Sequence, residues 1–477
     1  MAGIGGRLMN AVMAGVIGYI LIQFLIGALV SRRISTERDY INAGRKLGPV
    51  IGTFTVFATW FGAEVIVGTS GSVYEQGLKG AEFDPFGYAL SLFIAGIVFA
   101  AALWRRGLTT FADFFRDRFG TATERLVVVL LVPGSIFWAA AQIRAFGQVV
   151  SAVSETDVTI AITFAAVVVS AYTVLGGLMA DAITDLVQGI AVIVGLVVLA
   201  VLAADSVGGF TASIATIPTE RFDIATAPDG VGWGERIEHW LIPVCGTVVA
   251  IELVSRILGC RSAQVAARAT MAGAGLYLTV GLIPVYLGLI GPAIIPGLSG
   301  DNLEQVVPQM AERLMPDLLY VVFAGAIISA ILSTVDSTLI AAASLLSHNV
   351  LMELAGNPGE RTRLLAVRAS VVVLTIVAYL LAMTATSIRD LVEVAAAFGS
   401  SGVVVCLVFG LFTRFGGQLS ALAALLTGAS VWGVATLTGG TTTPYSYALC
   451  AAVAAYVLLA RFGARAAAPA EPDRIAR

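Results

Sequence analysis

Long apolar runs alternate with short polar segments along the whole chain. The runs are mostly about 18 residues or longer, the length that an α-helix needs to cross the hydrocarbon core of a bilayer. No polar segment between them is long enough to form a soluble catalytic domain. The pattern predicts an all-α polytopic membrane protein with about 13 transmembrane helices, near residues 10–31, 48–74, 83–104, 126–152, 157–175, 183–204, 237–258, 268–292, 318–347, 364–385, 388–411, 417–437 and 445–463.

The composition agrees with a membrane protein. The chain has 477 residues, of which 58% are hydrophobic and 12% are charged, whereas a soluble domain carries about 25% charged residues. The first apolar run lacks a basic leading segment and a small-residue cleavage site, so we expect a retained helix rather than a signal peptide. The formal net charge of −3 indicates no particular partner. We expect contact with the lipid bilayer and none with nucleic acid, and the oligomeric state stays open.

Basic residues are distributed unevenly between alternate loops. Of the 28 Lys and Arg residues, 21 lie at or after the ends of the odd-numbered spans. The positive-inside rule assigns those loops to the cytoplasm. We therefore expect an integral protein of a bacterial-type plasma membrane, with its N-terminus outside and its C-terminus in the cytoplasm. The Ala- and Pro-rich tail over 464–477 is expected to be disordered.

Glycine and proline interrupt the second and the seventh spans, and each of these spans also carries a carboxylate, Glu64 or Glu252. Such residues weaken a helix, and non-helical backbone at membrane depth is tolerated only where it lines a cavity or is buried in protein. The interrupting residues are Gly62, Gly68 and Gly71 in the second span, and Pro243 and Gly246 in the seventh.

The two interrupted spans divide the chain into similar halves. Counting five spans from each gives residues 48–204 and 237–411, and an odd number of helices in each half would invert the second half relative to the first. One extra helix (10–31) precedes them and two (417–463) follow, within one transporter domain. Paired interrupted helices in inverted halves predict a secondary transporter with a site at the membrane midplane, although glycines in membrane helices more often serve packing.

The ninth span carries a dense group of polar side chains. Within Ala324–Ser347 they are Ser333, Thr334, Asp336, Ser337 and Thr338. A carboxylate at this depth costs about 2.5–3.5 kcal/mol, and neighbouring hydroxyls are hard oxygen ligands for a small cation. An ion pathway is favoured. Alternatively, the hydroxyls bond to carbonyls of their own helix, and Asp336 pairs with another helix.

Several motifs together resemble the sodium/solute symporter family. They are YTVLGGLMADAITDLVQ from Tyr172, the STVDS stretch, INAGRKLGP, and the interrupted ATWFGAEVIVGTSGSVY. The resemblance covers nearly the whole chain. It implies the LeuT-type fold, in which two inverted five-helix repeats are here accompanied by one extra helix before and two after. It also implies sodium as the coupling ion.

The resemblance assigns ion-binding residues to this chain. It places the sodium ion between the first helix of repeat one and the third helix of repeat two. The implied ligands are the carbonyls of Ala58, Phe61 and Ala330 and the hydroxyls of Ser333 and Thr334. Asp185 matches an aspartate that some members use on an inward ion path or at a second ion site, and we place Asp336 on the same path. Capping or a salt bridge is an equally good explanation of Asp185.

Within the family, the chain is most similar to the branch of the high-affinity choline transporter, through ATWFG, PFGYALSL and FWAAA. That branch surrounds a quaternary ammonium with aromatic faces, and Trp60, Tyr88 and Trp138 are the matching positions. Each could instead be a packing or interfacial aromatic residue. The resemblance is incomplete, because the cage position of the seventh span holds Ala250, and Val392 and Glu393 stand near the cage position of the eleventh span.

Acidic residues are present instead of a complete set of aromatic residues. Glu64 and Glu252 are therefore candidates for contact with the substrate. The carboxylates of Glu64, Glu252 and Glu393 indicate a cationic substrate or proton coupling, or else pairing with Arg144 of the fourth span. The sequence does not decide between these roles.

The sequence thus predicts a sodium-coupled symporter that imports a small polar organic solute, such as choline or another amine. One alternative is a protein of the same fold that carries an amino acid or carboxylate, as proline or pantothenate carriers do. Another is a symporter-like membrane sensor, and a channel is a third. Neither GxxxxGK[ST] nor GxSxG occurs, so we expect neither ATP-driven transport nor an enzyme.

The charge asymmetry can be tested by cysteine labelling. A cysteine at Ser35 or Asn357 should react with an impermeant reagent only from the cytoplasm, and one at Asp205 or Gly300 only from outside, because of the bias in basic residues. Labelling of the Asp205 and Asn357 positions from the same side would contradict the layout of about 13 spans.

Overall fold

The computed structural model describes residues 18, 21–22, 24–26, 28–30, 32, 34–154, 157–225, 232–356, 358–385 and 388–466. Most of the predicted first span (10–31) and of the tail (464–477) lies outside them. The described elements are helices, with a single bridge between Leu47 and Cys260. This confirms the all-α class.

The first half of the chain forms the following helices. They are α2 (Glu37–Asn42), η1 (Ala43–Arg45), α3 (Pro49–Trp60), η2 (Glu64–Gly68), α4 (Thr69–Gln76), η3 (Gly77–Ala81), η4 (Glu82–Gly87), α5 (Tyr88–Ile94), η5 (Ala95–Ala100), α6 (Ala101–Arg105), α7 (Phe111–Phe119), α8 (Thr121–Ser154) and α9 (Val158–Ser206). The predicted fifth and sixth spans are joined in α9, which breaks its helical geometry at Gly177, where φ is +56°. A positive φ suits glycine, since it has no Cβ.

The second half follows two short connecting helices, α10 (Phe210–Ala215) and η6 (Thr219–Phe222). Its helices are α11 (Trp233–Val248), α12 (Ile251–Gly259), α13 (Ala263–Ile294), η7 (Gly300–Gln305), α14 (Val306–Leu314), α15 (Asp317–Leu346), η8 (Ser347–Leu351), α16 (Met352–Leu354), α17 (Glu360–Thr384), α18 (Ile388–Ala397) and α19 (Ser400–Phe412). The chain ends with α20 (Gln418–Thr438) and α21 (Pro444–Ala466).

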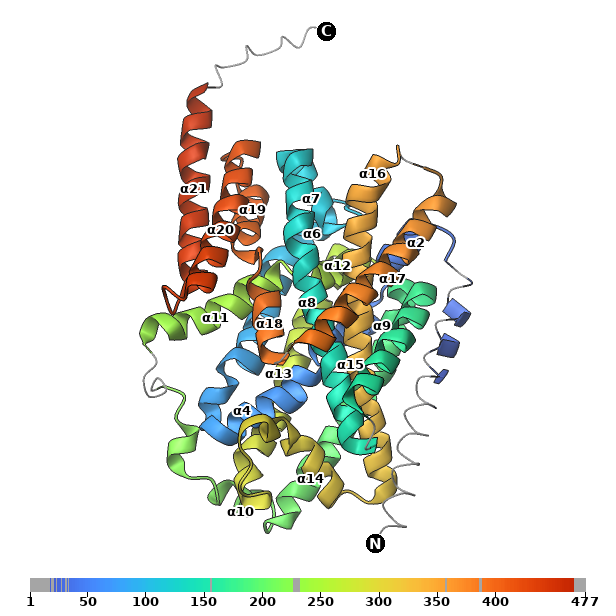
Figure 1. Cartoon of the computed structure of the whole chain (residues 1–477), viewed down its shortest axis with the longest axis vertical. Helices are drawn as coiled ribbons and strands as arrows, with labels where there is room; N and C mark the ends of the chain where they lie inside the picture. Colours follow the sequence, from blue (N-terminus) through green and yellow to red (C-terminus); the bar gives the residue numbers. More distant parts are fainter. Residues whose placement is uncertain are drawn as a thin grey trace.

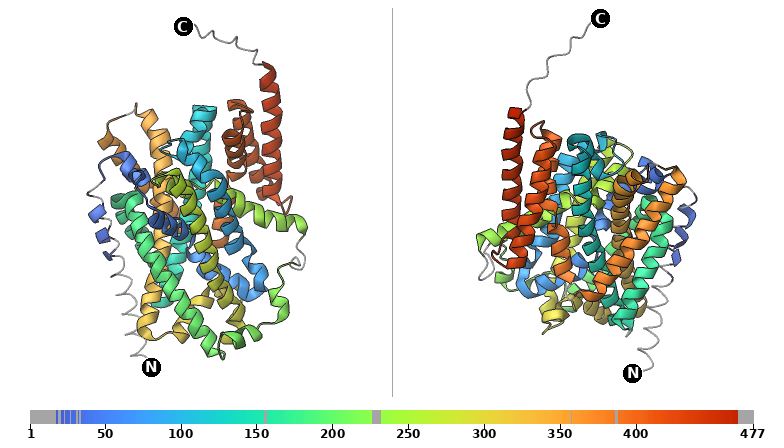
Figure 2. Two further views of the ribbon diagram at one scale, coloured as in Figure 1. Left: turned by 180° about the vertical axis from the view of Figure 1, so that it is seen from behind. Right: turned by 45° about the horizontal axis from the view of Figure 1, so that its top comes forward.

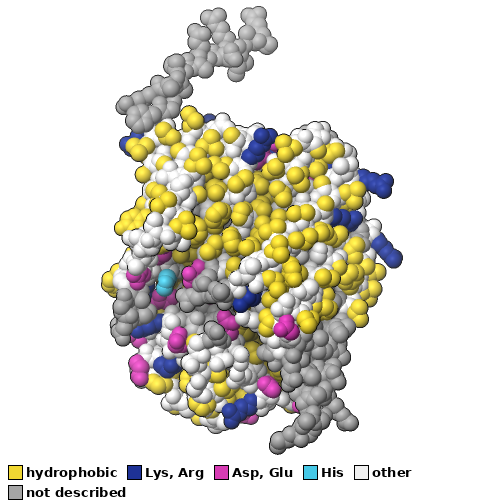
Figure 3. All heavy atoms as spheres, in the orientation of Figure 1, with side chains coloured by type: hydrophobic (Ala, Val, Ile, Leu, Met, Phe, Trp, Pro, Cys, Tyr) yellow, Lys and Arg dark blue, Asp and Glu magenta, His cyan; other side chains and the backbone are white. Residues whose placement is uncertain are grey.

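The described residues include 9 helices that are long and apolar enough to cross a membrane, or up to 10 if the bent pair α11–α12 is one span. The protein is therefore an integral membrane protein, while the count of about 13 spans remains a prediction. In the face shown in Figure 3, hydrophobic side chains cover a broad area, and acidic side chains gather below it. A lipid-facing surface needs such an apolar area.

Helix α15 forms the centre of the bundle. Its residues from Phe323 to Leu345 are all buried, and it packs against α3, α8, α9 and α17. Helices α20 and α21 lie beside α19 at one edge, opposite α9 (Figures 1 and 2). The polar stretch predicted to form an ion pathway is therefore in the interior of the protein and does not face lipid.

An ionic network joins helix ends on the side that we expect to be cytoplasmic. Nδ1 of His348 in η8 lies 3.2 Å from the carboxylate of Glu37 in α2, and a guanidinium nitrogen of Arg363 in α17 lies 3.3 Å from it. Burial alone would raise the pKa of Glu37, but its partners His348 and Arg363 hold this pKa below its ordinary value. The network fixes α2 against the ends of the central helices.

A buried ion pair joins the two halves of the chain. Arg256 of α12 is fully buried and donates to the carboxylate of Asp181 in α9 and to the hydroxyl of Ser337 in α15. A guanidinium without exposure to water is stable only when it has such partners.

We predict that Arg256→Met lowers the stability of the folded protein by about 3–5 kcal/mol, because it leaves the Asp181 carboxylate buried and unpaired. The measurement is thermal unfolding of the purified protein in detergent. Adding Asp181→Asn to the same variant should recover part of the loss. An unchanged melting temperature of Arg256→Met would show that the pair does not stabilise the bundle.

Candidate functional site

A pocket lies between the two interrupted helices, and we call it the central pocket. Its walls come from α3, α5, α8, α11, α12, α18 and α19, and they include Trp60, Tyr88, Ser135, Trp138, Ala250, Glu252 and Phe398. Both halves of the chain contribute to it. The predicted substrate residues Trp60, Tyr88, Trp138 and Glu252 are thus brought together, whereas Glu64 lines a separate cavity described below.

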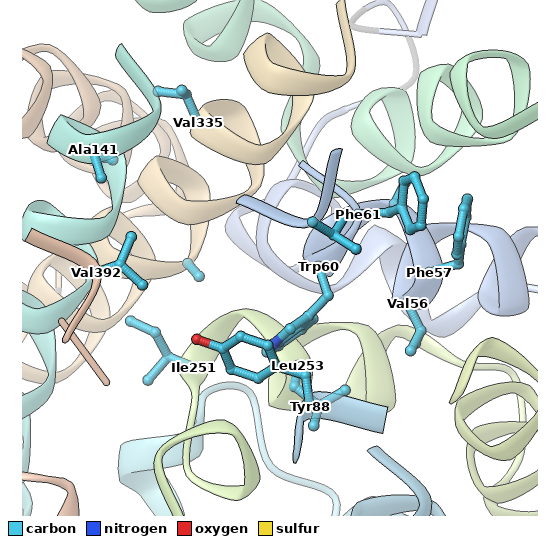
Figure 4. Packing of buried hydrophobic residues seen from close by; sticks show 14 of the residues in the cluster. Val56, Phe57, Trp60, Phe61, Tyr88, Ala141, Ile251, Leu253, Val335 and Val392 are labelled. Atoms are coloured by element: carbon cyan, nitrogen blue, oxygen red, sulfur yellow. The ribbon is translucent and has the colours of Figure 1, made fainter. Parts of the chain in front are cut away.

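The first interruption follows Trp60, where α3 ends. Phe61 leaves the helical region (φ −86°, ψ 68°), and the amide of Gly62 donates to the carbonyl of Trp60 over 3.0 Å. In a continuous helix that amide would donate to Ala58. The turn directs the Trp60 side chain away from Phe57 and Phe61 and to the same side as Tyr88 (Figure 4).

The second interruption separates α11 from α12, whose axes are bent by 40°. A Cβ at Gly246 would lie 2.6 Å from the carbonyl oxygen of Ala396, so only glycine allows α11 to approach α18 this closely. Ala250 is the N-cap of α12, and Glu252 lies in the first turn of that helix. The break therefore places a carboxylate in the wall of the central pocket.

Aromatic side chains form one corner of the pocket. The rings of Tyr88 and Trp138 are perpendicular (90°), with centroids 6.4 Å apart. Trp60 and Tyr88 are 6% and 2% exposed, and the Tyr88 hydroxyl is buried without a hydrogen-bond partner among the described residues. The missing aromatic residue at position 250 leaves a small alanine in the wall, and Val392 and Glu393 line the other cavity instead.

The carboxylate of Glu252 is held by a serine. The Ser135 hydroxyl of α8 donates to this carboxylate over 2.5 Å, and Glu252 is 8% exposed. Within the described part of the chain, Glu252 makes no ion pair. Arg144 instead donates to the carbonyl of Ala382 over 3.1 Å. In the structure, Glu252 therefore does not pair with Arg144, which was one of the predicted alternatives.

The residues predicted to bind sodium lie at the junction of α3 and α15. A Cβ on Gly62, next to Phe61, would be 3.2 Å from the Thr334 hydroxyl. That hydroxyl donates to the Ala330 carbonyl over 3.2 Å. The end of α3, which carries the carbonyls of Ala58 and Phe61, thus faces the segment of α15 that carries the other three predicted ligands.

Asp185 lies directly behind these residues and is fully buried. Ser333 donates to one of its oxygens, and Thr55 of α3 donates to the other over 2.5 Å. The salt bridge considered for Asp185 is made by Asp181, one helical turn earlier, which the sequence analysis missed. Asp336 is also buried, and its Oδ1 has no hydrogen-bond partner in the described structure.

Two further residues of α8 were missed as well, Ser135 and Gln142. Gln142 is 1% exposed, and neither atom of its amide has a partner among the described residues. Its Oε1 would be 3.1 Å from a Cβ on Gly62, close to Thr334. A signal was present in the sequence: Ser135, Trp138 and Gln142 are spaced three and four residues apart, which puts them on one helical face.

A second cavity opens on the side that we expect to be extracellular, and we call it the outer cavity. Acidic residues dominate its described lining, whose basic members are Lys79 and His239. The acidic residues are Glu64, Glu75, Glu82, Asp84, Glu304 and Glu393. Arg236 of α11 pairs with Glu82 over 2.5 Å. Oδ2 of Asp84 is buried without a hydrogen-bond partner in the described part of the chain, and Oδ1 accepts from Tyr277 over 2.5 Å.

Comparisons with known proteins agree with this architecture. The sequence matches the sodium:solute symporter family over residues 40–428. High-affinity choline transporter 1 of Drosophila melanogaster is 28% identical over 404 residues, which cover 79% of this chain and 63% of that protein. High-affinity proline transporter PutP of Bacillus subtilis (strain 168) is 26% identical over 433 residues, or 86% and 88% of the two chains.

A solved structure of a Na⁺-coupled sialic acid symporter in a substrate-bound outward-open state superposes with a TM-score of 0.84 at 17% identity, covering 97% of this chain and 98% of that chain. This similarity establishes the LeuT-type fold, as the sequence motifs predicted. The relatives are transporters and not enzymes. Because the matched segment includes both interrupted helices and the polar centre of α15, the chain belongs to the sodium:solute symporter family.

Proposed function

We propose that this protein is a sodium-coupled symporter that imports a small polar organic solute, a quaternary or other amine such as choline. The observation that carries this proposal is the shared position of the two interruptions. They flank one pocket with aromatic residues and a carboxylate, and the first of them also faces the hydroxyls of α15. Sites at paired interrupted helices are typical of secondary transporters.

The proposed sodium ligands are the carbonyls of Ala58, Phe61 and Ala330 and the hydroxyls of Ser333 and Thr334. They come from one helix of each half, so a bound ion would hold α3 and α15 in one relative position. Ion binding would then favour one conformation of the transporter. Gln142 adds an amide oxygen beside the same junction. Asp185 and Asp336 are proposed for a second ion path.

The proposed substrate residues are Trp60, Tyr88, Trp138 and Glu252, with Glu64 at the outer cavity. The name of the Drosophila relative supports choline or a similar amine. An amino acid or carboxylate substrate is the main alternative, which the proline transporter supports. It also gains support from the N-terminus of α12 at the pocket wall, since helix N-termini favour anions. A membrane sensor would bind solute without transporting it.

We further propose the orientation and setting of the protein. The bias of the basic residues supports an N-terminus outside, a cytoplasmic C-terminus and a bacterial-type plasma membrane. The outer cavity would then receive solute while the central pocket is open to the outside. Closure would follow when ion and solute are both present, and the two halves would rock about the pocket.

The sodium site can be tested with hydroxyl variants. Ser333→Ala or Thr334→Ala should raise the sodium concentration for half-maximal uptake by about tenfold, because each substitution removes one of the oxygen atoms that would coordinate the sodium ion. Sodium should also raise the melting temperature of the wild type more than potassium does, and less so in the variants. Ser344→Ala is the matched control, since that hydroxyl bonds to the Ile340 carbonyl of the same helix. Variants with wild-type sodium dependence would refute the assignment.

The role of Trp60 can be tested in the same assay. Trp60→Leu should lower the affinity for the transported amine by more than about tenfold, because it removes a desolvated cation–π contact worth about 2 kcal/mol. Trp60→Phe should lower it less, since Phe is a weaker aromatic partner. The measurements are Michaelis constants for uptake into proteoliposomes.

Phe57→Leu serves as the control for Trp60, because Phe57 is buried on the same helix, 4.7 Å from the ring of Phe61 and away from the pocket. A tryptophan with only a packing role would give the opposite result. Both Trp60 variants would then lose yield or melting temperature, and their Michaelis constants would stay at the wild-type value.

A further inference from the structure

We propose that the substrate is a small protonated amine that retains at least one N–H bond, and not a fully methylated ammonium. This inference rests on the proposed symport function and narrows its substrate from a quaternary or other amine to an amine with an N–H bond, since it concerns the solute held in the central pocket. Three features of that pocket carry it: the carboxylate of Glu252, the hydroxyl of Tyr88, and the incomplete aromatic wall.

The ionised carboxylate of Glu252 has no cationic partner in an ion pair within the described structure. It is 8% exposed and lines the central pocket. The guanidinium of Arg256, one turn further along α12, is already bound by Asp181. A buried carboxylate without a positive partner is costly at membrane depth. A positively charged solute would remove that cost.

The same carboxylate distinguishes between kinds of cation. Its two oxygens offer about four acceptor positions, and Ser135 supplies one donor. The nitrogen of a quaternary ammonium carries only alkyl groups, so it would displace water from the carboxylate and return no N–H hydrogen bond. A protonated amine donates through N–H, and hydrogen bonds to a charged group are the stronger kind. The carboxylate therefore favours an amine that keeps a hydrogen on nitrogen.

The aromatic residues cover only part of the pocket wall, which suits an amine that also needs hydrogen-bond acceptors. Tyr88 and Trp138 meet at a right angle, and Trp60 adds a third side chain, but small residues such as Ala250 and Ala396 complete the lining. Aromatic faces on part of the pocket attract a cation without surrounding it. The buried Tyr88 hydroxyl has no partner among the described residues. It can accept a second N–H from the amine, which a methyl group could not supply.

The charge of the outer cavity agrees with a cationic solute. Its described lining holds far more carboxylates than basic groups. Acidic side chains around a cleft raise the local concentration of cations and repel anions. A solute that reaches the central pocket through this cavity would be selected for positive charge before it meets Glu252.

Glu252 has a competing role that requires no ligand. An acidic residue in the first turn of α12 is stabilised by the positive end of the helix. In that case its replacement would lower stability and leave ligand preference unchanged. The experiment must therefore compare ligands within one variant, and not only activities between variants.

The test uses a methylation series on purified protein in sodium buffer at neutral pH, where alkylamines are protonated. The ligands are ethanolamine, N-methylethanolamine, N,N-dimethylethanolamine and choline, in which each step replaces one N–H bond with an N–CH3 bond. Binding is measured by calorimetry or thermal shift, and competition by uptake into proteoliposomes. We expect the affinity to fall by about tenfold or more at the last methylation, where the last N–H is lost.

Two variants complete the test. Glu252→Gln should weaken the binding of the N–H amines by about tenfold and the binding of choline much less, so that the affinities of the four ligands become more similar. Glu238→Gln is the matched control, because Glu238 is a buried glutamate of α11 that lies outside the pocket and accepts from the backbone of Tyr445. This variant should keep the wild-type differences in affinity between the four ligands. If Glu252→Gln does not fold, the wild-type series alone still decides the proposal.

Three results would overturn the proposal: choline binding as tightly as the N–H amines, an unchanged series in Glu252→Gln, or no binding of any member. If no amine binds while proline or another solute is taken up with sodium, the substrate class is wrong and the proposed symport stands. If no solute tested shows sodium-dependent uptake and sodium does not stabilise the protein, the proposed function itself is wrong.

Discussion

The structure depends on one constraint, the need of every backbone amide and carbonyl at membrane depth for a hydrogen-bond partner. A helix satisfies this need within itself, so each interruption must be enclosed by protein. In this chain, α8, α15 and α18 enclose the breaks after Trp60 and Val248. The pocket exists because the two breaks are enclosed together. Side chains beside the breaks, such as Trp60 and Glu252, then line one pocket instead of facing lipid.

The same enclosure explains why charged side chains can occupy the interior. Arg256 is buried with Asp181, and Asp185 is buried with hydroxyl donors from α3 and α15. Each of these contacts joins segments that are far apart in sequence. Buried charges tolerate few other arrangements, because an unpaired group costs several kcal/mol. They therefore fix how α9, α12 and α15 sit against one another, which the apolar packing around them could not specify alone.

The sequence predicted the fold class and the pocket better than the partners of individual side chains. Hydrophobic runs and the glycine and proline positions depend on local physics, so they located the helices and both interruptions. Trp60, Tyr88 and Trp138 were predicted through motifs, and Glu252 through its place beside the second interruption. The pairing of Ser135 with Glu252, and of Asp181 instead of Asp185 with Arg256, depends on helix rotation and long-range contacts. A difference of one turn along α9 decides which aspartate meets the guanidinium, and hydropathy carries no such information.

The arrangement of Ser333 shows how a buried carboxylate can act on an ion site without being a ligand. A hydroxyl has one proton and two lone pairs. Ser333 donates that proton to Asp185, and Thr55 donates to the other oxygen of the same carboxylate. The proton of Ser333 therefore points toward α9, and its two lone pairs remain available to a cation. For the proposed sodium site, Asp185 would orient an oxygen ligand and add negative charge behind it. Because Thr55 belongs to α3 and Ser333 to α15, the carboxylate also ties together the two helices that an ion between them would hold.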